Sequence, residues 1–157
     1  MINQNRMNNK ICIVYTHHKR GDLIWQLPSI KAISNHHGEK IDLILRKKTQ
    51  AKNMIKIFKL EKYEFVYILD KVNKPAIAAK FAKIRNIIGP GLGNQKKWLT
   101  SKNFLDQNDW KLSYSEQSQK LLKINSIKFD DKFPNLEVDI ERFKKDNTDI
   151  LIPGKKI

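Results

Sequence analysis

Short apolar runs alternate with segments of helical spacing through this chain, and that alternation restricts the folds it can adopt. Runs rich in β-branched residues lie at 10–16, 41–46, 64–70 and 86–89. Between them the apolar residues recur at helical spacing, which is typical of amphipathic helices. Strands that alternate with helices through short connections form parallel βαβ units. The sequence therefore predicts an α/β fold with a Rossmann-like parallel sheet and flanking helices.

Three helices are predicted between these strands. The first begins at Asp22 and ends near Gly38, the second is capped by Thr49, and the third is opened by Pro75. Pro28 lies inside the first helix, and proline has no N–H to donate to the preceding turn. We therefore expect the start of that helix to be kinked or loosely bonded.

The chain beyond residue 90 is less regular. Residues 91–110 have the composition of a basic loop, and no secondary structure is predicted for them. Ser113 and Glu116 then have the spacing of a capping box, in which each side chain bonds the other residue's backbone N–H. This signature, followed by apolar residues at helical spacing, predicts a helix over 114–125.

Composition shifts divide the chain into four parts. Residues 1–9 are polar and are interpreted as a disordered lead-in, and 10–125 form the Rossmann-like domain. Residues 126–148 have the composition of a linker. Residues 149–157 have the pattern of the opening of another strand.

The net charge of +15 arises from 31 lysines and arginines against 16 aspartates and glutamates. Lysines outnumber arginines by 26 to 5, which is the bias of an AT-rich coding sequence, whereas proteins that read nucleic-acid grooves usually use arginine. The charge is therefore interpreted first as a solvated lysine surface, and nucleic acid is disfavoured as a partner. A single cysteine forms no internal disulfide, and no apolar run approaches the roughly 20 residues that span a bilayer. These features predict a cytoplasmic protein.

Common catalytic and cofactor motifs do not occur in the sequence. The glycines at 89, 91 and 93 do not complete a dinucleotide fingerprint, because Asn94 stands where the third glycine of that motif belongs. The patterns of P-loops, zinc proteases and serine-hydrolase elbows are also missing. We therefore predict no cofactor bound by this chain.

The histidines and the cysteine do not predict a metal site. His17–His18 and His36–His37 are neighbours in sequence, and neighbours in a regular helix or strand point to different faces. Cys12 lies in a predicted buried strand, where a thiol usually behaves as a small apolar side chain.

The loop after the first strand carries the best candidate for chemistry. In open α/β sheets, ligands bind beyond the carboxyl ends of the strands, and Gly21 and Asp22 are predicted at that edge. Asp22 also opens a helix, whose free N–H groups favour negative charge. Asp22 is a candidate catalytic base, and the alternative is that it only caps the helix.

Several segments together resemble glycosyltransferase family 9, the ADP-heptose:lipopolysaccharide heptosyltransferases. The resemblance extends from about residue 10 to residue 154 and rests on these segments: Ile11–Tyr15, Gly21–Ile24 with Pro28, Ile41–Leu45, Tyr67–Asp70, Lys74–Ala79, Ile87–Gly89, Trp98–Thr100, Glu116 and Asp149–Gly154. Members of this family have a two-domain GT-B fold. Their N-terminal domain binds the acceptor sugar and their C-terminal domain binds the nucleotide-sugar donor. The resemblance places this chain at the N-terminal half of such an enzyme and implies that residues 149–157 are the start of the second, donor-binding domain.

The resemblance implies an inverting, metal-independent transfer of heptose from ADP-heptose to the lipopolysaccharide inner core. Asp22 is then the general base that accepts the proton of the attacking hydroxyl, and a carboxylate is ionised at neutral pH. Gly21, Lys19, Arg20 and Lys74 are the implied substrate-binding residues, with the cations facing phosphate or carboxylate groups of the acceptor.

The resemblance also implies that the donor site lies outside this chain. We expect a truncated or split enzyme that transfers no sugar alone and is completed by a donor domain, which a separate polypeptide could supply. The acceptor would place it against the inner membrane, where its lysines allow contact with anionic lipid. The alternative function is a small basic module that binds nucleic acid or an anionic membrane surface, suggested by the net charge and by Lys96-Lys97-Trp98.

Overall fold

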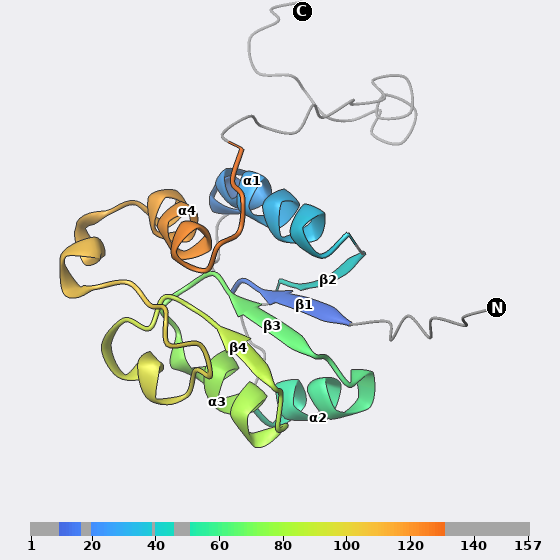
Figure 1. The fold of residues 1–157 in the computed structure, drawn as a ribbon. Coiled ribbons are helices and arrows are strands. Elements are labelled where there is room, and N and C mark those ends of the chain that lie inside the picture. Colours follow the sequence, from blue (N-terminus) through green and yellow to red (C-terminus); the bar gives the residue numbers. More distant parts are fainter. Residues whose placement is uncertain (1–9, 17–19, 39, 46–50, 131–157) are drawn as a thin grey trace, which may run out of the picture.

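The computed structural model describes residues 10–16, 20–38, 40–45 and 51–130 (Figure 1). Its centre is a parallel sheet of four strands in the order β2-β1-β3-β4. The strands are β1 (Ile11–Val14), β2 (Ile41–Ile44), β3 (Phe65–Ile68) and β4 (Asn86–Ile88). The predicted α/β fold with a parallel sheet is confirmed.

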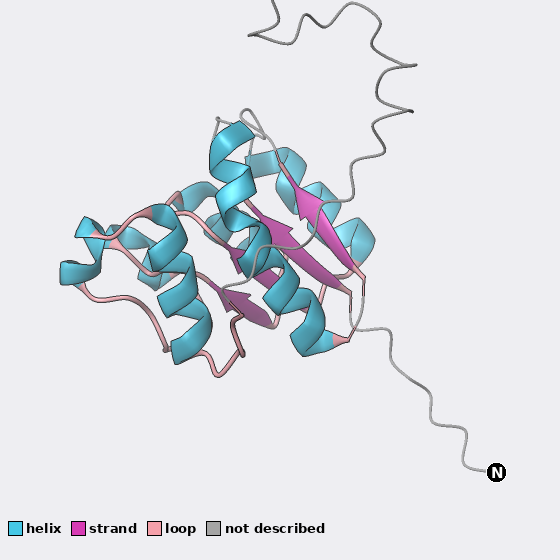
Figure 2. Cartoon of the chain, turned by 90° about the horizontal axis from the view of Figure 1, so that it is seen from above, coloured by secondary structure: helices cyan, strands magenta, loops and turns pink. Residues whose placement is uncertain are grey.

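Four α-helices cover the sheet. They are α1 (Arg20–His37), α2 (Ala51–Glu61), α3 (Asn73–Phe81) and α4 (Tyr114–Ile124). Helices α1 and α4 lie on one face of the sheet and α2 and α3 on the other, so the sheet forms the middle of three layers (Figures 1 and 2). None of the described helices is long and apolar enough to cross a membrane.

Burial on both faces explains why the strands are apolar runs rather than alternating ones. Cys12 and Val14 belong to the core cluster that includes residues of α2 and α3, and Ile11 and Ile13 belong to the cluster that includes residues of α1. All four side chains are at most 1% exposed. Strand β2 differs because it lies at the edge of the sheet, where Leu43 is 37% exposed.

The structure changes the predicted boundaries in several places. The strands are shorter than the apolar runs, α1 begins at Arg20 instead of Asp22, and α3 begins at Asn73 instead of Pro75. The segment 91–110, for which no structure was predicted, contains the two 3₁₀ helices η1 (Gly93–Lys97) and η2 (Gln107–Lys111). The predicted fourth helix and its capping box at Ser113 are confirmed.

The described start of the predicted linker packs on the domain. Ile127 is 3% exposed in the same core cluster as β1, and Phe129 packs against that cluster. The predicted lead-in, the cap at Thr49 and the predicted strand at 149–157 lie outside the described residues.

The connectivity creates a switch point between β1 and β3. From β1 the chain passes through α1 to β2 on one side, and from β2 it passes through α2 to β3 on the other side of β1. Helices α1 and α2 consequently lie on opposite faces of the sheet (Figure 1). In open α/β sheets the crevice at such a point, beyond the carboxyl ends of the strands, is the usual place for a ligand.

Candidate functional site

A buried carboxylate joins the two loops at the switch point. Asp70 follows β3 and is 2% exposed. Its Oδ2 accepts hydrogen bonds from the Thr16 backbone N–H at 2.7 Å and the Thr16 hydroxyl at 2.8 Å, and its Oδ1 accepts one from the Val72 N–H at 3.0 Å. Hydrogen bonds to a carboxylate are stronger than those between neutral groups. Asp70 therefore holds the segments that follow β1 and β3 in a fixed position relative to each other.

A buried glutamine holds the next loop to the same place. Gln95 of η1 is fully buried, and its Nε2 donates to the carbonyls of Asp70 at 2.9 Å and Val72 at 3.1 Å. Its Oε1 accepts from the Gly91 N–H at 2.9 Å. The loops after β3 and β4 are thus tied together by one side chain.

Asp22 lies in the first turn of α1 and lines a hollow of about 480 Å³. The other residues that line it are Trp25 of α1 and Ser113, Tyr114, Ser115 and Glu116 at the start of α4. The volume falls in the range of small-molecule sites, and the starts of two helices converge on it. Asp22 is the third residue of its helix, in the first turn, where a carboxylate also stabilises the positive end of the helix, so its position is compatible with the alternative capping role.

Two hydrogen bonds hold the start of α1 against the start of α4. Gln26 Nε2 donates to the Tyr114 carbonyl at 3.1 Å, and the Ser115 hydroxyl donates to the Trp25 carbonyl at 3.3 Å. Both bonds lie close to Pro28, whose missing N–H weakens the regular bonding of this part of the helix. Contacts with α4 thus support the turn that carries Asp22.

A buried tyrosine lies beneath the site. Tyr15, directly after β1, is 1% exposed. Burial raises the pKa of its phenol, and the nearby charges of Asp22 and Asp70 raise it further. The phenol is therefore neutral throughout the physiological range, and it lies close enough to both carboxylates to feel their charge.

Glu116 completes the capping box of α4. Its Oε2 accepts hydrogen bonds from the Ser113 N–H at 2.8 Å and the Ser113 hydroxyl at 2.7 Å. These bonds lower the pKa of Glu116, so it is ionised at neutral pH. Its carboxylate lines the hollow while it caps the helix.

The structure places the other predicted substrate-binding residues as follows. Gly21 is exposed beside Asp22, and a Cβ added to it would meet no atom within 4 Å. Lys19 and the side chain of Arg20 lie outside the described residues. Lys74 is exposed in the first turn of α3 and does not line the hollow. The described structure therefore does not bring Lys74 to the Asp22 hollow.

In the described part of the chain, Cys12 and His37 have surroundings typical of residues that stabilise the fold. Cys12 is fully buried, and burial raises the pKa of its thiol. A hydrogen bond of 2.8 Å joins His37 Nε2 to the buried Tyr67 hydroxyl. No group of three or more histidine, cysteine, aspartate or glutamate side chains among the described residues is arranged to hold a metal ion.

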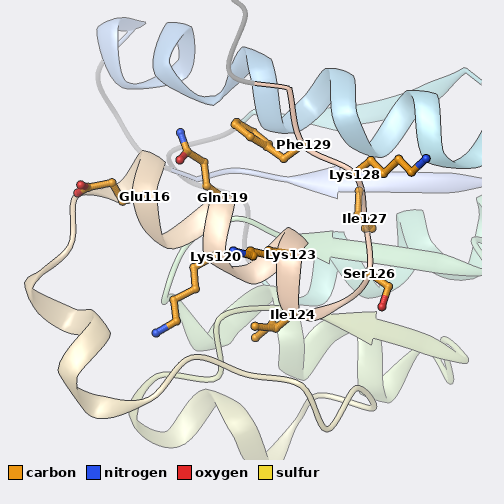
Figure 3. Close-up of a pocket in the computed structure, with 9 residues that line it drawn as sticks. All are labelled: Glu116, Gln119, Lys120, Lys123, Ile124, Ser126, Ile127, Lys128 and Phe129. Carbon is orange, nitrogen blue, oxygen red and sulfur yellow. The ribbon is translucent and has the colours of Figure 1, made fainter.

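A second, larger hollow of about 1070 Å³ runs between α4 and the segment 126–129 (Figure 3). Lys120, Lys123 and Lys128 line it, but Lys120 and Lys128 point away from each other (Figure 3). Lys120 also pairs with Asp109 at 2.6 Å. This groove therefore lacks a convergent set of cations for one anion.

Trp110 is another exposed aromatic side chain, and a cation lies over its ring. Trp110 of η2 is 48% exposed, and Lys71 Nζ lies 4.9 Å from the centre of its ring. Lys71 directly follows Asp70 at the carboxyl end of β3. Trp110 does not line the Asp22 hollow.

Sequence reasoning missed Thr16, Gln95, Tyr15 and Trp25 as parts of this edge. Thr16 had a detectable signal, since a polar residue directly after a buried strand lies at the carboxyl edge. Gln95 had none, because its partners lie up to 25 positions away.

No family model matches this chain, and neither the curated proteins nor the solved structures contain a significant match.

Proposed function

We propose that this chain is the acceptor-binding domain of a glycosyltransferase similar to the family 9 heptosyltransferases. The observation that carries the proposal is the position of Asp22. It lies in the first turn of α1, which follows β1 in the chain, and it lines a hollow together with Trp25, Tyr114, Glu116 and the two serines at the start of α4. An ionised carboxylate there can accept the proton of an acceptor hydroxyl as that oxygen attacks the donor sugar.

The rest of the catalytic apparatus is proposed to come from a second domain with the GT-B arrangement. That domain binds ADP-heptose and presents its anomeric carbon to the acceptor. Lys19 and Arg20, which precede Asp22 in the sequence, and Lys74 of α3, which lies away from the hollow, are proposed to bind the acidic groups of the inner-core acceptor. The 157-residue chain incubated with ADP-heptose and acceptor is expected to transfer no heptose, and detectable turnover would contradict this division of labour.

Acceptor binding tests the proposal directly. Core oligosaccharide from heptose-deficient lipopolysaccharide is titrated calorimetrically into the wild-type chain and into Asp22→Ala. We expect saturable binding by the wild type and a loss of about tenfold or more in Asp22→Ala, because one hydrogen bond to a charged acceptor is removed.

Glu61→Ala is the matched control, since Glu61 is a carboxylate on α2, on the other face of the sheet, paired with Lys10. Unchanged affinity is expected for this variant. The proposal fails if the wild type does not bind the oligosaccharide, or if Asp22→Ala binds it as tightly as the wild type.

The net charge of +15 favours one competing function, a module for nucleic acid or an anionic membrane surface. Such binding depends on lysines and decreases steeply with salt. Binding to single-stranded DNA or to anionic vesicles that disappears with salt and does not change in Asp22→Ala would favour this function over acceptor binding.

A further inference from the structure

The indole of Trp25 is exposed to solvent, although burial of this side chain would stabilise the fold more. It is 59% exposed in the second turn of α1, although tryptophan gains more than other residues from burial. Lone exposed apolar side chains are common on protein surfaces. Trp25 differs because its side chain lines a hollow together with Tyr114 and a carboxylate.

The position of the indole relative to Asp22 is fixed by the helix. Residues three apart in an α-helix lie on the same face, so Trp25 and Asp22 are neighbours along one side of α1. The Trp25 carbonyl accepts a hydrogen bond from the Ser115 hydroxyl, and Gln26 Nε2 donates one to the Tyr114 carbonyl. The backbone that carries the indole is thus held against the opposite wall of the hollow.

The chemistry of the walls defines the ligand class. An indole and a phenol offer flat apolar surfaces, and the carboxylates accept hydrogen bonds. The two serine hydroxyls donate to Glu116 and to the Trp25 carbonyl, and their oxygens can still accept hydrogen bonds. The described residues that line the hollow include two carboxylates and no cation. A phosphate or carboxylate group inside the hollow would be repelled by Asp22 and Glu116 and would be costly to desolvate. A ring with one apolar C–H face and a hydroxylated rim satisfies these walls, whereas an acidic ring does not.

We propose that Trp25 is the platform on which a neutral pyranose ring stacks while one of its hydroxyls meets Asp22. This inference rests on the proposed function and specifies it: the acceptor sugar in this hollow is uncharged, and the acidic groups of the acceptor lie outside the hollow.

The test uses two ligands that differ in one group. Methyl α-mannopyranoside and its 6-carboxylate counterpart, methyl mannopyranosiduronate, are titrated into the full chain. Binding is followed by saturation-transfer NMR and tryptophan fluorescence. We expect the neutral glycoside to bind at least about tenfold more tightly than the uronate.

Three variants identify the platform. Trp25→Ala should lose binding of the neutral glycoside by about tenfold or more, and Trp25→Phe should retain most of it because a flat ring remains. Trp110→Ala is the matched control, since Trp110 is similarly exposed but lies outside the hollow, and it should bind as the wild type does. Circular dichroism verifies that each variant is folded.

Each contrary result has a distinct meaning. Equal binding by Trp25→Ala and the wild type overturns the platform, and equal affinity for glycoside and uronate overturns the neutral specificity. If neither ligand binds the wild type saturably, the inference falls. The oligosaccharide titration with Asp22→Ala then decides separately whether the proposed function falls as well.

Discussion

Replacing Gly91 by alanine tests whether the loop after β4 is as tightly packed as the structure indicates. Gly91 is buried with φ of +69°, and a Cβ at this position would lie 2.4 Å from the Cβ of Phe104 and 2.7 Å from its Cγ. The left-handed conformation costs a non-glycine residue about 1–2 kcal/mol. Overpacking adds about 1–3 kcal/mol. Gly91→Ala should therefore lower the free energy of unfolding by about 2–5 kcal/mol, a large part of the roughly 5–15 kcal/mol of a typical domain.

Gly38→Ala separates the two contributions. Gly38 follows α1 with φ of +65°, but a Cβ there would meet no atom within 4 Å. This variant should lose only the conformational part, about 1–2 kcal/mol. Urea unfolding followed by circular dichroism compares the two, and equal losses in both variants would refute the packing argument.

Partial rescue provides a second check on the Gly91 prediction. Phe104→Ala removes the ring atoms but keeps the Cβ that lies 2.4 Å from the added methyl group. In a double-mutant cycle, Gly91→Ala should therefore cost less free energy of unfolding in the Phe104→Ala background than in the wild type, and less still in the Phe104→Gly background. The Gly91 N–H donates to Gln95, which in turn donates to the carbonyls of Asp70 and Val72, so a shift of this loop also acts on the loop after β3.

Two further stability predictions follow from the buried carboxylates. Asp70→Ala leaves three donors without their acceptor and should lower the free energy of unfolding in urea by about 2–5 kcal/mol. Thr16→Val removes one of those donors and should lower it by about 1–2 kcal/mol. A loss below about 1 kcal/mol in Asp70→Ala would show that the hydrogen bonds of Asp70 contribute little to stability. The hydrogen bond from Lys120 lowers the pKa of Asp109. The stability that Asp109 contributes to the folded state is therefore present above the ordinary carboxyl pKa and is lost as pH falls through the lowered value. Asp109→Asn should flatten the acid side of the Tm profile measured from about pH 2 to about pH 7, and an unchanged profile would contradict this assignment.

The parallel sheet could be predicted because its information is local. Strands buried on both faces are continuous apolar runs, and the helices between them show their own period. The strand order could not be predicted in the same way. The pairing of β1 with both β2 and β3 depends on which face each crossover helix covers, and no short window of sequence contains that choice.

The candidate site was predictable only in part for the same reason. The position of Asp22 could be predicted from the preceding strand and from the helix that contains it, because these elements are adjacent in the sequence. Trp25 and Tyr114 meet across the hollow from positions 89 residues apart, and Gln95 reaches back to Asp70 from another loop. Their roles come from the packing of α4 on α1 and of η1 on the β3 exit. The Asp106–Asp109 capping box of η2 did have a local signal, two carboxylates at the spacing of a capping box, and sequence analysis overlooked it.

Polar side chains are buried on both α1 and α4. In the described residues, Gln26 Oε1 and the hydroxyls of Ser29 and Ser118 are buried without a hydrogen-bond partner, and all three side chains belong to α1 or α4. Trp25 is exposed on the same pair of helices. A buried polar group without a partner lowers stability. The groove beside 126–129 shows no comparable cost, because its long cationic side chains are partly solvated and one is already paired with Asp109. The rest of the seam is apolar, since Ala32 and Ile33 of α1 and Leu122 of α4 are at most 5% exposed in one core cluster, so the packing of α4 on α1 sets the shape of the hollow beside Asp22.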